Sequence, residues 1–415
     1  MKQQPVSARA PARSVKFQTP HRLTFADAAD VAAKLSPDTP VHCFSPTLLK
    51  AKLAVFRDGF PGEVSYAVKA NDGEHVLAAL AANGLAVFDV ASLEEMAAVR
   101  AKAPHARLHY HNPIKSRNEI ATAAERFGCA RFAADDPQEV DKIVAAGGVT
   151  EKLEIAVRFK LPKHSASAHD FSGKFGAEPE LAMRLLRQVA GHGAQPMLTF
   201  HPGSQCGDPA IWTAHIHAAA EIARGAGIRL AALNVGGGFP SRYVGLNAPD
   251  LSVYFAAIEK ASIEAFGADF VPVLECEPGR GIIAGSTSVL ARVKLVKAAS
   301  REIYLNDGIY GSLMEVYQVP VLQPYAQAIG GKGAIEGEPL GFTVYGPTCD
   351  PLDRLPNRIN LPAGIAEGDY VEFGPLGAYG TATSTRFNGY PPAEIIEVER
   401  VLEQFPVDLI QNADI

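Results

Sequence analysis

The chain has 415 residues, of which 47% are hydrophobic, and a formal net charge of −6 at pH 7. This length is sufficient for a barrel of about 250 residues together with a second domain. The acidic balance, with a pI near 6.1, argues against the basic surface by which proteins bind nucleic acid. No apolar run approaches the roughly 20 residues of a membrane span, and the N-terminal segment lacks the apolar core of a secretory signal.

Residues 1–20 contain basic residues and no acid, and we expect them to form a flexible tail. The five cysteines are scattered and form no CxxC pair: Cys43, Cys129, Cys206, Cys276 and Cys349. An odd, scattered set is typical of reduced thiols rather than of disulfides or a metal site. We therefore expect a cytoplasmic protein that binds no metal.

Eight short apolar segments are predicted to be strands buried on both faces. They are Ser65–Ala70, Ala86–Ala91, Arg107–Asn112, Ala130–Ala134, Lys152–Lys160, Pro196–His201, Ile228–Val235 and Phe270–Glu275. Segments with apolar residues at three- and four-residue spacing alternate with them and are predicted to be helices. These are Glu74–Ala82, Leu93–Lys102, Arg117–Phe127, Gln138–Ala146, Glu180–Ala190, Ile211–Arg224 and Val253–Phe266. The alternation predicts an α/β fold with a (β/α)8 TIM barrel over residues 46–284.

The pattern changes after Arg280, where strands follow one another without intervening helices. The predicted strands are Ser288–Lys297, Glu302–Leu305, Phe342–Tyr345, Tyr370–Phe373 and Glu394–Glu399, and the predicted loops are Gly330–Gly337 and Pro356–Gly368. The N-terminal segment Val41–Phe44 also has the composition of a strand. We therefore expect a C-terminal, mainly β domain made of residues 21–45 together with 285–415.

Reactive residues lie at the ends of the predicted barrel strands, where TIM barrels place their active sites. Lys69 ends the first strand, and lysine is the side chain that forms imines with aldehydes. The alternative, which Lys69 alone favours, is a lysine that extends into solvent. Gly236–Gly238 and Arg280 follow the seventh and eighth strands, where barrels often hold phosphate. An aldehyde and a phosphate together describe pyridoxal phosphate.

Two further residues at this rim suit the same ligand. Glu277 is placed to hydrogen-bond the ring nitrogen, and His201 is placed to stack on the ring. The alternative for each residue is a purely structural role.

In its sequence motifs, the chain resembles the fold-type III pyridoxal-phosphate decarboxylases. This family includes the ornithine and diaminopimelate decarboxylases and has an alanine racemase-like barrel. The motifs occur in order from about residue 40 to 390: Tyr66–Asn71, Phe88–Ser92, His201–Ser204, Gly236–Pro240, Glu277–Arg280, Asn306–Gly308, Gly346–Asp350 and Phe387–Gly389.

The resemblance implies pyridoxal 5′-phosphate as cofactor and a homodimer whose active sites are shared between subunits. It makes Lys69 the imine lysine, supported by Asp89 and Arg158. It implies that His201 stacks on the ring, that Glu277 pairs with the ring nitrogen and that Cys349 returns the proton to Cα. It also implies that Asp350 reaches into the partner's site. The implied phosphate-binding residues are Ser204, Gly236, Gly237, Gly238, Gly279, Arg280 and Tyr379.

The implied reaction is decarboxylation of a small basic amino acid. Cys349-Asp350 followed by Asp353-Arg354 resembles the ornithine type, in which the aspartate faces the distal ammonium. We therefore expect L-ornithine first and L-lysine second.

One position departs from that pattern. Ornithine enzymes carry a second acid where this chain has Gln318, and Glu315 is a candidate to replace it, with Tyr310 as a further candidate for substrate contact. Other substrates therefore stay open, namely D-ornithine, D-lysine, diaminopimelate, arginine or an N-substituted diamino acid. A non-catalytic paralogue similar to the antizyme inhibitors and an amino-acid racemase are weaker alternatives.

Overall fold

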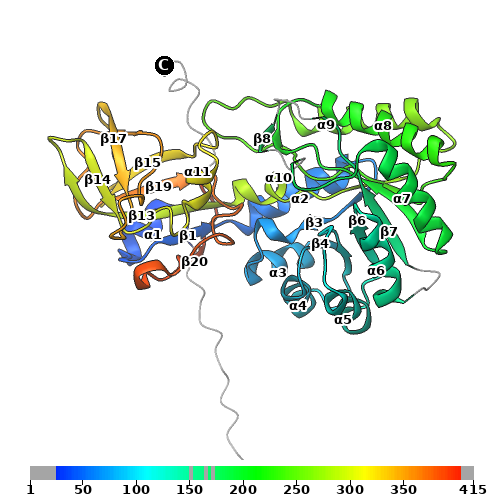
Figure 1. Cartoon of the computed structure of the whole chain (residues 1–415). Helices are drawn as coiled ribbons and strands as arrows, with labels where there is room; N and C mark the ends of the chain where they lie inside the picture. Colours follow the sequence, from blue (N-terminus) through cyan, green and yellow to red (C-terminus); the bar gives the residue numbers. More distant parts are fainter. Residues whose placement is uncertain (1–24, 149–152, 163–166, 170–172, 403–415) are drawn as a thin grey trace, which may run out of the picture.

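The computed structural model describes residues 25–148, 153–162, 167–169 and 173–402. The predicted tail, residues 1–20, lies outside these ranges, as do residues 21–24 and 403–415 of the expected β domain. The described chain forms a barrel and a sheet that lie side by side (Figure 1).

The barrel is a parallel sheet of nine strand segments in the order β2-β12-β11-β9-β7-β6-β5-β4-β3. Its two end segments, β2 (Glu63–Val64) and β3 (Tyr66–Ala67), are consecutive in the chain and separated only by Ser65, whose N–H donates to the carbonyl of Cys276. The sheet therefore closes on itself as eight strands, and the predicted TIM barrel is confirmed. The other strands are β4 (Val87–Val90), β5 (Arg107–Tyr110), β6 (Arg131–Ala134), β7 (Glu154–Arg158), β9 (Gln195–Thr199), β11 (Ala232–Asn234) and β12 (Val273–Cys276).

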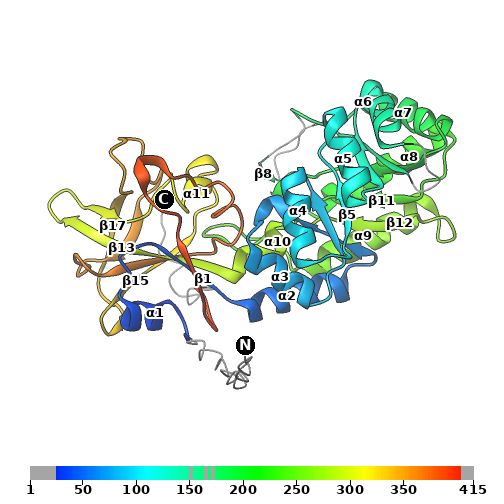
Figure 2. The same ribbon diagram turned by 90° about the horizontal axis from the view of Figure 1, so that it is seen from below.

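Helices surround these strands (Figure 2). They are α2 (Pro46–Gly59), α3 (Glu74–Ala82), α4 (Leu93–Lys102), α5 (Arg117–Phe127), α6 (Pro137–Gly147), α7 (Pro179–Gly191), α8 (Ala210–Ala226), α9 (Leu251–Phe266) and the short α10 (Arg280–Ile283). Several begin at a side-chain cap, such as Ser92 before α4 and the Ser116–Glu119 capping box of α5. Helix α2 was not predicted, although Ser45 caps it and Pro46 occupies its first position.

The first predicted barrel strand, Ser65–Ala70, extends too far at its C-terminal end. Strand β3 stops at Ala67, and Val68–Ala70 form a 3-10 turn, η1, that carries Lys69. The turn is closed by the N–H of Asn71 on the carbonyl of Val68, and the Tyr66 hydroxyl donates to the carbonyl of Asn71 at 3.0 Å. A small hairpin of β8 (Ser167–His169) and β10 (Ser204–Cys206) was also not predicted.

The second sheet confirms the C-terminal, mainly β domain. Its order is β16-β15-β19-β13-β14-β17-β18, and β1 (Val41–Phe44) pairs with both β13 and β20. Its other strands are β13 (Thr287–Lys297), β14 (Glu302–Leu305), β15 (Tyr325–Gly330), β16 (Gly333–Ala334), β17 (Pro339–Tyr345), β18 (Ile359–Pro362), β19 (Tyr370–Gly374) and β20 (Glu394–Glu397). Helix α1 (Ala28–Leu35) packs on β15, and short turns form η2 (Ala284–Ser286) and η3 (Phe387–Gly389).

Three predictions for this domain are wrong. The predicted loops Gly330–Gly337 and Pro356–Gly368 contain β16 and β18, and helix α11 (Met314–Gln318) interrupts the strands. Strand β18 is four residues long and ends in proline, so it gives little local signal. It forms because β17 pairs with it, with Phe342 opposite Ile359.

The C-terminal ends of the barrel strands face the β domain. The N–H of Tyr379 donates to the carbonyl of Ala70 at 2.7 Å, and the Asn71 amide donates to the carbonyl of Gly377 at 2.9 Å. Helix α11 reaches the same rim through a buried contact between Glu315 and Arg280. The functional residues therefore lie between the two domains.

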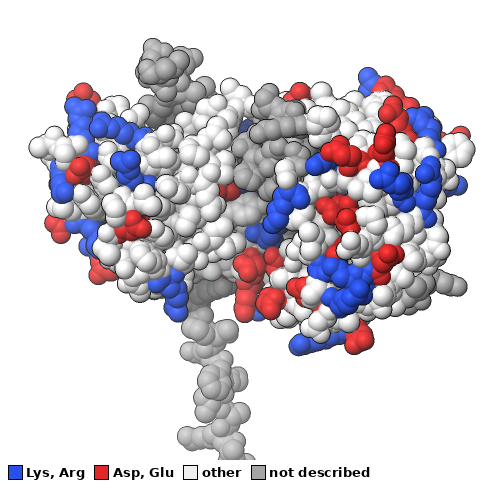
Figure 3. Space-filling model, viewed as in Figure 1, with Lys and Arg blue, Asp and Glu red and all other residues white. Residues whose placement is uncertain are grey.

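On the face drawn in Figure 3, acidic and basic side chains are interspersed over both domains. That face has no extended basic surface of the kind that binds nucleic acid. Of the helices in the described ranges, none is both long and apolar enough to cross a membrane.

Candidate active site

Lys69 lies on the η1 turn at the barrel rim, with its Nζ 3.5 Å from an Asp89 carboxylate oxygen. Its side chain keeps 44% of its surface exposed, whereas the Asp89 side chain is buried. Burial alone would lower the pKa of Lys69, but the negative charges of Asp89 and Glu277 outweigh it and raise that pKa above its ordinary value. Lys69 is therefore a charged amine beside a buried carboxylate, and its side chain stays partly exposed at the rim.

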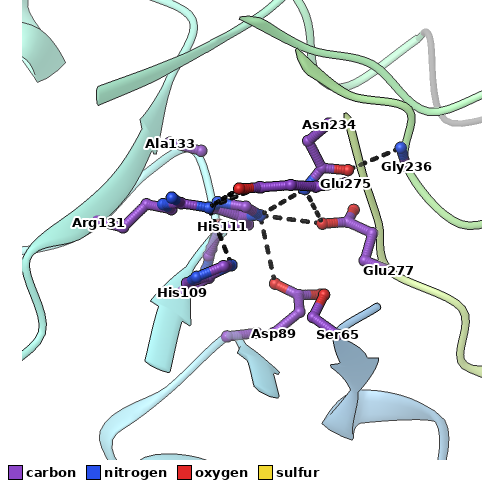
Figure 4. Close-up of polar contacts among 12 residues, drawn as sticks. Ser65, Asp89, His109, His111, Arg131, Ala133, Asn234, Gly236, Glu275 and Glu277 are labelled. Atoms are coloured by element: carbon purple, nitrogen blue, oxygen red, sulfur yellow. Dashed lines mark hydrogen bonds and ion pairs between the residues drawn. The ribbon is translucent and has the colours of Figure 1, made fainter. Parts of the chain in front are cut away.

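Two buried carboxylates, Asp89 and Glu277, meet one buried histidine, His111, at the barrel rim (Figure 4). His111 Nδ1 lies 2.9 Å from Glu277 Oε2 and 3.8 Å from Asp89 Oδ1. Burial raises the pKa of Asp89 to about 6, with a contribution from the charge of Glu277. Burial would also raise the pKa of Glu277, but the hydrogen bond and charge of His111 outweigh it and hold that pKa at about 2.

Backbone pairing places these side chains. His111 directly follows β5, and its N–H donates to the carbonyl of Val90 on β4. Glu277 directly follows β12, and its N–H donates to the carbonyl of Gly236 after β11. The Asn234 amide donates to Glu277 Oε2 at 3.1 Å, so this oxygen accepts two bonds, whereas Oε1 of Glu277 accepts none from the described residues.

A second layer of polar side chains lies deeper in the barrel, two residues earlier on the same strands. Arg131 donates to both oxygens of Glu275, at 2.6 and 2.5 Å, and through Nε to Glu154 at 2.6 Å. The same guanidinium lies 3.4 Å from His109 Nδ1 (Figure 4). Burial, followed by the charge of Arg131, lowers the pKa of His109 well below its usual range.

Sequence reasoning missed His109, His111, Arg131, Asn234 and Glu275. One signal was available in the alternation of polar residues at two strand ends. His109 lies on β5 and His111 directly follows it, and Glu275 lies on β12 and Glu277 directly follows it, so each pair points to one face. Charged residues repeated on a buried strand face imply a partner across the barrel. The sequence does not indicate that Arg131 would be the partner of Glu275.

His201 follows β9, and its Nδ1 accepts the N–H of Gly203 at 3.0 Å. Burial, aided by the charges of Arg158 and Lys69, lowers the pKa of His201 to about 3. The imidazole is therefore neutral, which suits a ring that packs face to face on another aromatic ring. Arg158 ends β7 and lies over the ring of Phe175, with 5.3 Å from the guanidinium carbon to the ring centroid.

Arg280 is buried at the start of α10 and donates four hydrogen bonds to three side chains. Its Nε donates to Ser204 at 3.3 Å, Nη1 donates to the Tyr243 hydroxyl at 2.7 Å, and the two terminal nitrogens form a fork on the Glu315 carboxylate. Its guanidinium carbon is 5.1 Å from the centroid of the Tyr379 ring. Glu315 is thus engaged by Arg280, and its contact with a substrate, which the sequence suggested, stays a prediction.

The rim glycines are required by close backbone packing. Gly236 and Gly238 have φ of +73° and +83°, and a Cβ on either would lie 2.2 or 2.3 Å from a backbone oxygen. A Cβ on Gly279 would lie 2.8 Å from Ala70 Cβ. Within the described ranges, the N–H groups of Gly237 and Gly238 donate to no protein acceptor, so they are available to an anion beside Arg280.

Cys349 and Asp350 lie on the loop between β17 and β18, and both are removed from this cluster. The thiol is exposed and donates to the Asn388 side chain at 3.2 Å. The Tyr310 hydroxyl donates to Asp350 at 2.5 Å and, with the Leu352 N–H, lowers the pKa of that carboxyl. Gln318 ends α11. In the described part of the chain, neither Cys349 nor Asp350 contacts Lys69, Asp89 or Glu277.

Large apolar side chains are exposed on the same side of the β domain. Leu352 is 56% exposed, and Phe387, whose ring lies 4.6 Å from that of Tyr310, is 42% exposed. Tyr317 and Val321, at and after α11, are 40% and 47% exposed. An exposed apolar surface that carries functional residues is typical of a protein interface.

The cluster offers the groups that an aromatic aldehyde phosphate needs. Lys69 supplies an amine, and Oε1 of Glu277 has no partner among the described residues and can accept a ring N–H. The N–H groups of Gly237 and Gly238 are open to an anion. Asp89, His111 and Glu277 also bring ligand atoms within 4.8 Å of one another, as in a metal site. Because Lys69 already supplies a positive charge beside Asp89, the chemistry favours the organic ligand.

Comparisons with known proteins agree with this geometry. Residues 47–284 match the family model of the pyridoxal-binding domain of pyridoxal-dependent decarboxylases. The chain is 31% identical over 384 residues to ornithine decarboxylase from Panagrellus redivivus, which covers 85% of this chain and 84% of that protein. It is 29% identical to antizyme inhibitor 2 from Xenopus laevis, over 80% of this chain and 74% of that protein. The crystal structure of a lysine/ornithine decarboxylase from Vibrio vulnificus complexed with cadaverine has a TM-score of 0.76 and 27% identity, covering 87% of this chain and 95% of that one.

Proposed function

This chain belongs to the pyridoxal-dependent decarboxylases, and from that premise we propose that it decarboxylates a basic L-amino acid, L-ornithine before L-lysine. The class of reaction, removal of the carboxylate of a basic amino acid, follows from the family. The choice of ornithine rests on Asp350, a partly buried carboxylate whose pKa is lowered by its hydrogen bond from Tyr310. A charge that stays negative at neutral pH suits the distal ammonium of ornithine.

The cofactor is pyridoxal 5′-phosphate, and the cluster at the barrel rim fits it. When bound, this cofactor accepts the electron pair that departing CO2 leaves at Cα. We propose that Lys69 holds its aldehyde carbon, that Oε1 of Glu277 bonds its ring N–H and that neutral His201 covers its face. Arg158 and Asp89 supply charge beside Lys69. The proposed phosphate-binding groups are Ser204, Gly236, Gly237, Gly238, Gly279, Arg280 and Tyr379.

We propose that Cys349 returns the proton to Cα in the site of a second subunit. Two observations support this arrangement. Cys349 and Asp350 have no contact with the described cluster around Lys69 of their own chain, and exposed Leu352 and Phe387 flank them on the same surface. A homodimer would cover these apolar side chains and bring the thiol to the partner's barrel rim.

The test of substrate is CO2 release by the purified protein with pyridoxal phosphate, with the amine product identified. The substrates are L-ornithine, L-lysine, L-arginine, meso-diaminopimelate and the D-forms of ornithine and lysine. We expect putrescine from L-ornithine at the highest kcat/KM, and cadaverine from L-lysine next. A preference for a D-form or for diaminopimelate would contradict the assignment, and Gln318 would then be the first residue to examine.

Asp350→Asn tests the residue that carries the proposal. It should raise the KM for ornithine by roughly ten-fold or more, because it removes the charge that pairs with the ammonium. Asp269→Asn, at an exposed position before β12, is the control and should leave KM unchanged. An unchanged KM in Asp350→Asn would remove Asp350 from the substrate site.

Shared sites are tested by mixing subunits. Lys69→Ala and Cys349→Ala chains, each inactive or slow alone, should regain activity when they are unfolded and refolded together, because a hybrid dimer has one site with both native residues. No gain over the separate variants would mean that each chain uses its own Cys349.

Similarity to antizyme inhibitor 2 supports a second candidate, a binding protein without activity. The chain keeps Lys69, Glu277, Arg280 and Cys349, so we place this candidate second. Absence of cofactor binding, together with no CO2 release from any of the substrates, would favour it.

A cytoplasmic location stays a prediction, supported by the fact that all five cysteines are free thiols.

A further inference from the structure

His111 contacts the residue proposed to hold the cofactor ring, and the proposed function gives it no role. Its side chain is buried, with Nδ1 2.9 Å from Glu277 Oε2. Its Nε2 is buried and has no hydrogen-bond partner among the described residues. Burying Nε2 without a partner costs free energy. The contact of Nδ1 with Glu277 is therefore the interaction that accounts for the placement of His111.

The surrounding hydrogen bonds determine which atom of His111 carries a proton. Asn234 Oδ1 accepts the N–H of Gly236 at 2.8 Å, so the NH2 end of this amide must face Glu277. That NH2 group also lies 3.4 Å from His111 Nδ1, so an unprotonated Nδ1 could accept a long hydrogen bond from it. It would then set its lone pair against the Glu277 oxygen at only 2.9 Å, and the shorter contact therefore favours a hydrogen on Nδ1 that is donated to Glu277.

Glu277 Oε2 thus accepts two hydrogen bonds, one from His111 and one from Asn234. Its carboxylate is held from one side only, which leaves Oε1 without a partner in the described chain (Figure 4). This is the arrangement that a donor arriving from the rim requires. It also explains why the pKa of Glu277 is lowered even though the side chain is buried.

A second buried carboxylate would compete for His111 if it were free. Glu275 lies two residues before Glu277 on the same face of the strand, as His109 does before His111. Arg131 takes both oxygens of Glu275, and it also lies against His109 Nδ1, which must then accept. Glu275 and His109 therefore have hydrogen-bond partners without His111, and the hydrogen bond of His111 is available to Glu277.

We propose that His111 is a positioning residue that holds Glu277 as a carboxylate with one oxygen free for the cofactor ring, and that Arg131 keeps His111 available by occupying Glu275. This inference rests on the proposed role of Glu277. The charged and titratable groups around the pair come from every packed element: Lys69 on η1, Asp89 on β4, His109 on β5, Arg131 on β6, Arg158 on β7, His201 after β9 and Glu275 on β12.

The test uses the full-length protein, freed of cofactor and titrated with pyridoxal phosphate. In His111→Ala, the dissociation constant should rise roughly ten- to hundred-fold, the amount expected for a lost charge-assisted hydrogen bond. The absorbance band of the bound cofactor should also change with pH in a range where the band of the unaltered protein is constant, because the pKa of Glu277 is no longer held low. A merely structural role for His111 would not produce this pH dependence.

Two further variants separate the hydrogen bond from packing. His111→Gln keeps an N–H that can reach Glu277 and should restore most of the affinity and the constant band. His42→Ala is the control for removal of a buried histidine, since His42 lies on β1 and bonds Ser312 at 2.7 Å. It should lower the melting temperature without altering the cofactor band. Should His111→Ala fail to fold, His111→Asn replaces it, because the shorter side chain does not reach Glu277.

The outcomes are distinct. A band and affinity in His111→Ala equal to those of the unaltered protein would overturn the inference, and so would equal losses in the Ala and Gln variants. Glu277→Gln checks the premise. If that variant binds the cofactor with an unaltered band, Glu277 does not contact the ring, and the failure then lies in the proposed function rather than in the role of His111.

Discussion

Glu277 in the barrel and Glu372 in the β sheet are similarly buried, 7% and 4% exposed, yet their pKa values move in opposite directions. Burial raises the pKa of Glu372 to about 7, although the Ser288 hydroxyl and the Leu402 N–H donate to it. At Glu277 the hydrogen bond and charge of His111 and the charge of Lys69 outweigh burial, and the pKa is held at about 2. Burial therefore does not determine the charge of a carboxylate here, and the nearby cations do.

The difference follows from how many elements meet at each side chain. Glu372 lies within β19, between β13 and β15, and its donors are a hydroxyl and one backbone N–H. Glu277 lies where the ends of parallel strands converge, so side chains from several strands reach it. A closed barrel thus assembles charge at one point, whereas an open sheet presents each side chain to its two neighbouring strands.

The largest expected effect is that of Lys69→Ala. Turnover should fall by roughly 10⁴-fold, because the variant lacks the only amine placed beside Asp89 in the described cluster. The absorbance band of the bound cofactor should also change. CO2 release and an absorbance spectrum check this, with exposed Lys52→Ala as the control. Unreduced turnover would show that the barrel cluster is not the reaction centre.

Glu315→Gln tests the contact that joins the two regions. With the fork on Arg280 broken, a buried guanidinium loses its carboxylate, and the free energy of unfolding of the cofactor-free protein should fall by about 3 to 5 kcal/mol. Pyridoxal phosphate should reduce this loss, because its phosphate can supply the missing anion. Glu302→Gln, which breaks an exposed pair with Lys297, should change stability little.

The result also decides between two roles for Glu315. If stability is unchanged and the KM for ornithine rises, Glu315 contacts the substrate, as its position in the sequence suggested. A stability loss with an unaltered KM would assign it to Arg280.

These residues also show how far the sequence predicts the molecule. The barrel was predictable because each strand and helix has a local pattern, and Glu277 and Arg280 were predictable because they follow the last barrel strand. Arg131 and Glu275 are 144 positions apart, and only closure of the barrel brings them together. The η1 turn under Lys69 likewise depends on a hydrogen bond from Tyr66, which no local pattern of apolar residues encodes.

Glu277→Gln should destabilise the cofactor-free protein by about 3 kcal/mol at neutral pH. The pKa of Glu277 lies below its unfolded value near 4.3, so its contribution is present above that pH and is lost as pH falls through 2. Urea unfolding of the variant and the unaltered protein at several pH values should therefore give curves that differ at neutral pH and converge in acid. Equal stability at neutral pH would mean that His111 does not stabilise the carboxylate.

The same substitution in the sheet, Glu372→Gln, should have an effect of the opposite sign and a similar size. Because the folded pKa of Glu372, about 7, lies above its unfolded value, its favourable contribution is present below about pH 4.3 and is lost as pH rises through 7. Glu372→Gln removes the buried charge while its amide oxygen still accepts from Ser288 and Leu402. The variant should therefore be more stable than the unaltered protein by about 3 kcal/mol above pH 7, and equal to it in acid.

Exposed Glu367→Gln, before the same strand, is the matched control and should show no such pH dependence. If Glu372→Gln instead destabilises the protein above pH 7, a cation must reach this glutamate as well. The barrel would then have no special means of holding a buried carboxylate charged, and the contrast between the two regions would be lost.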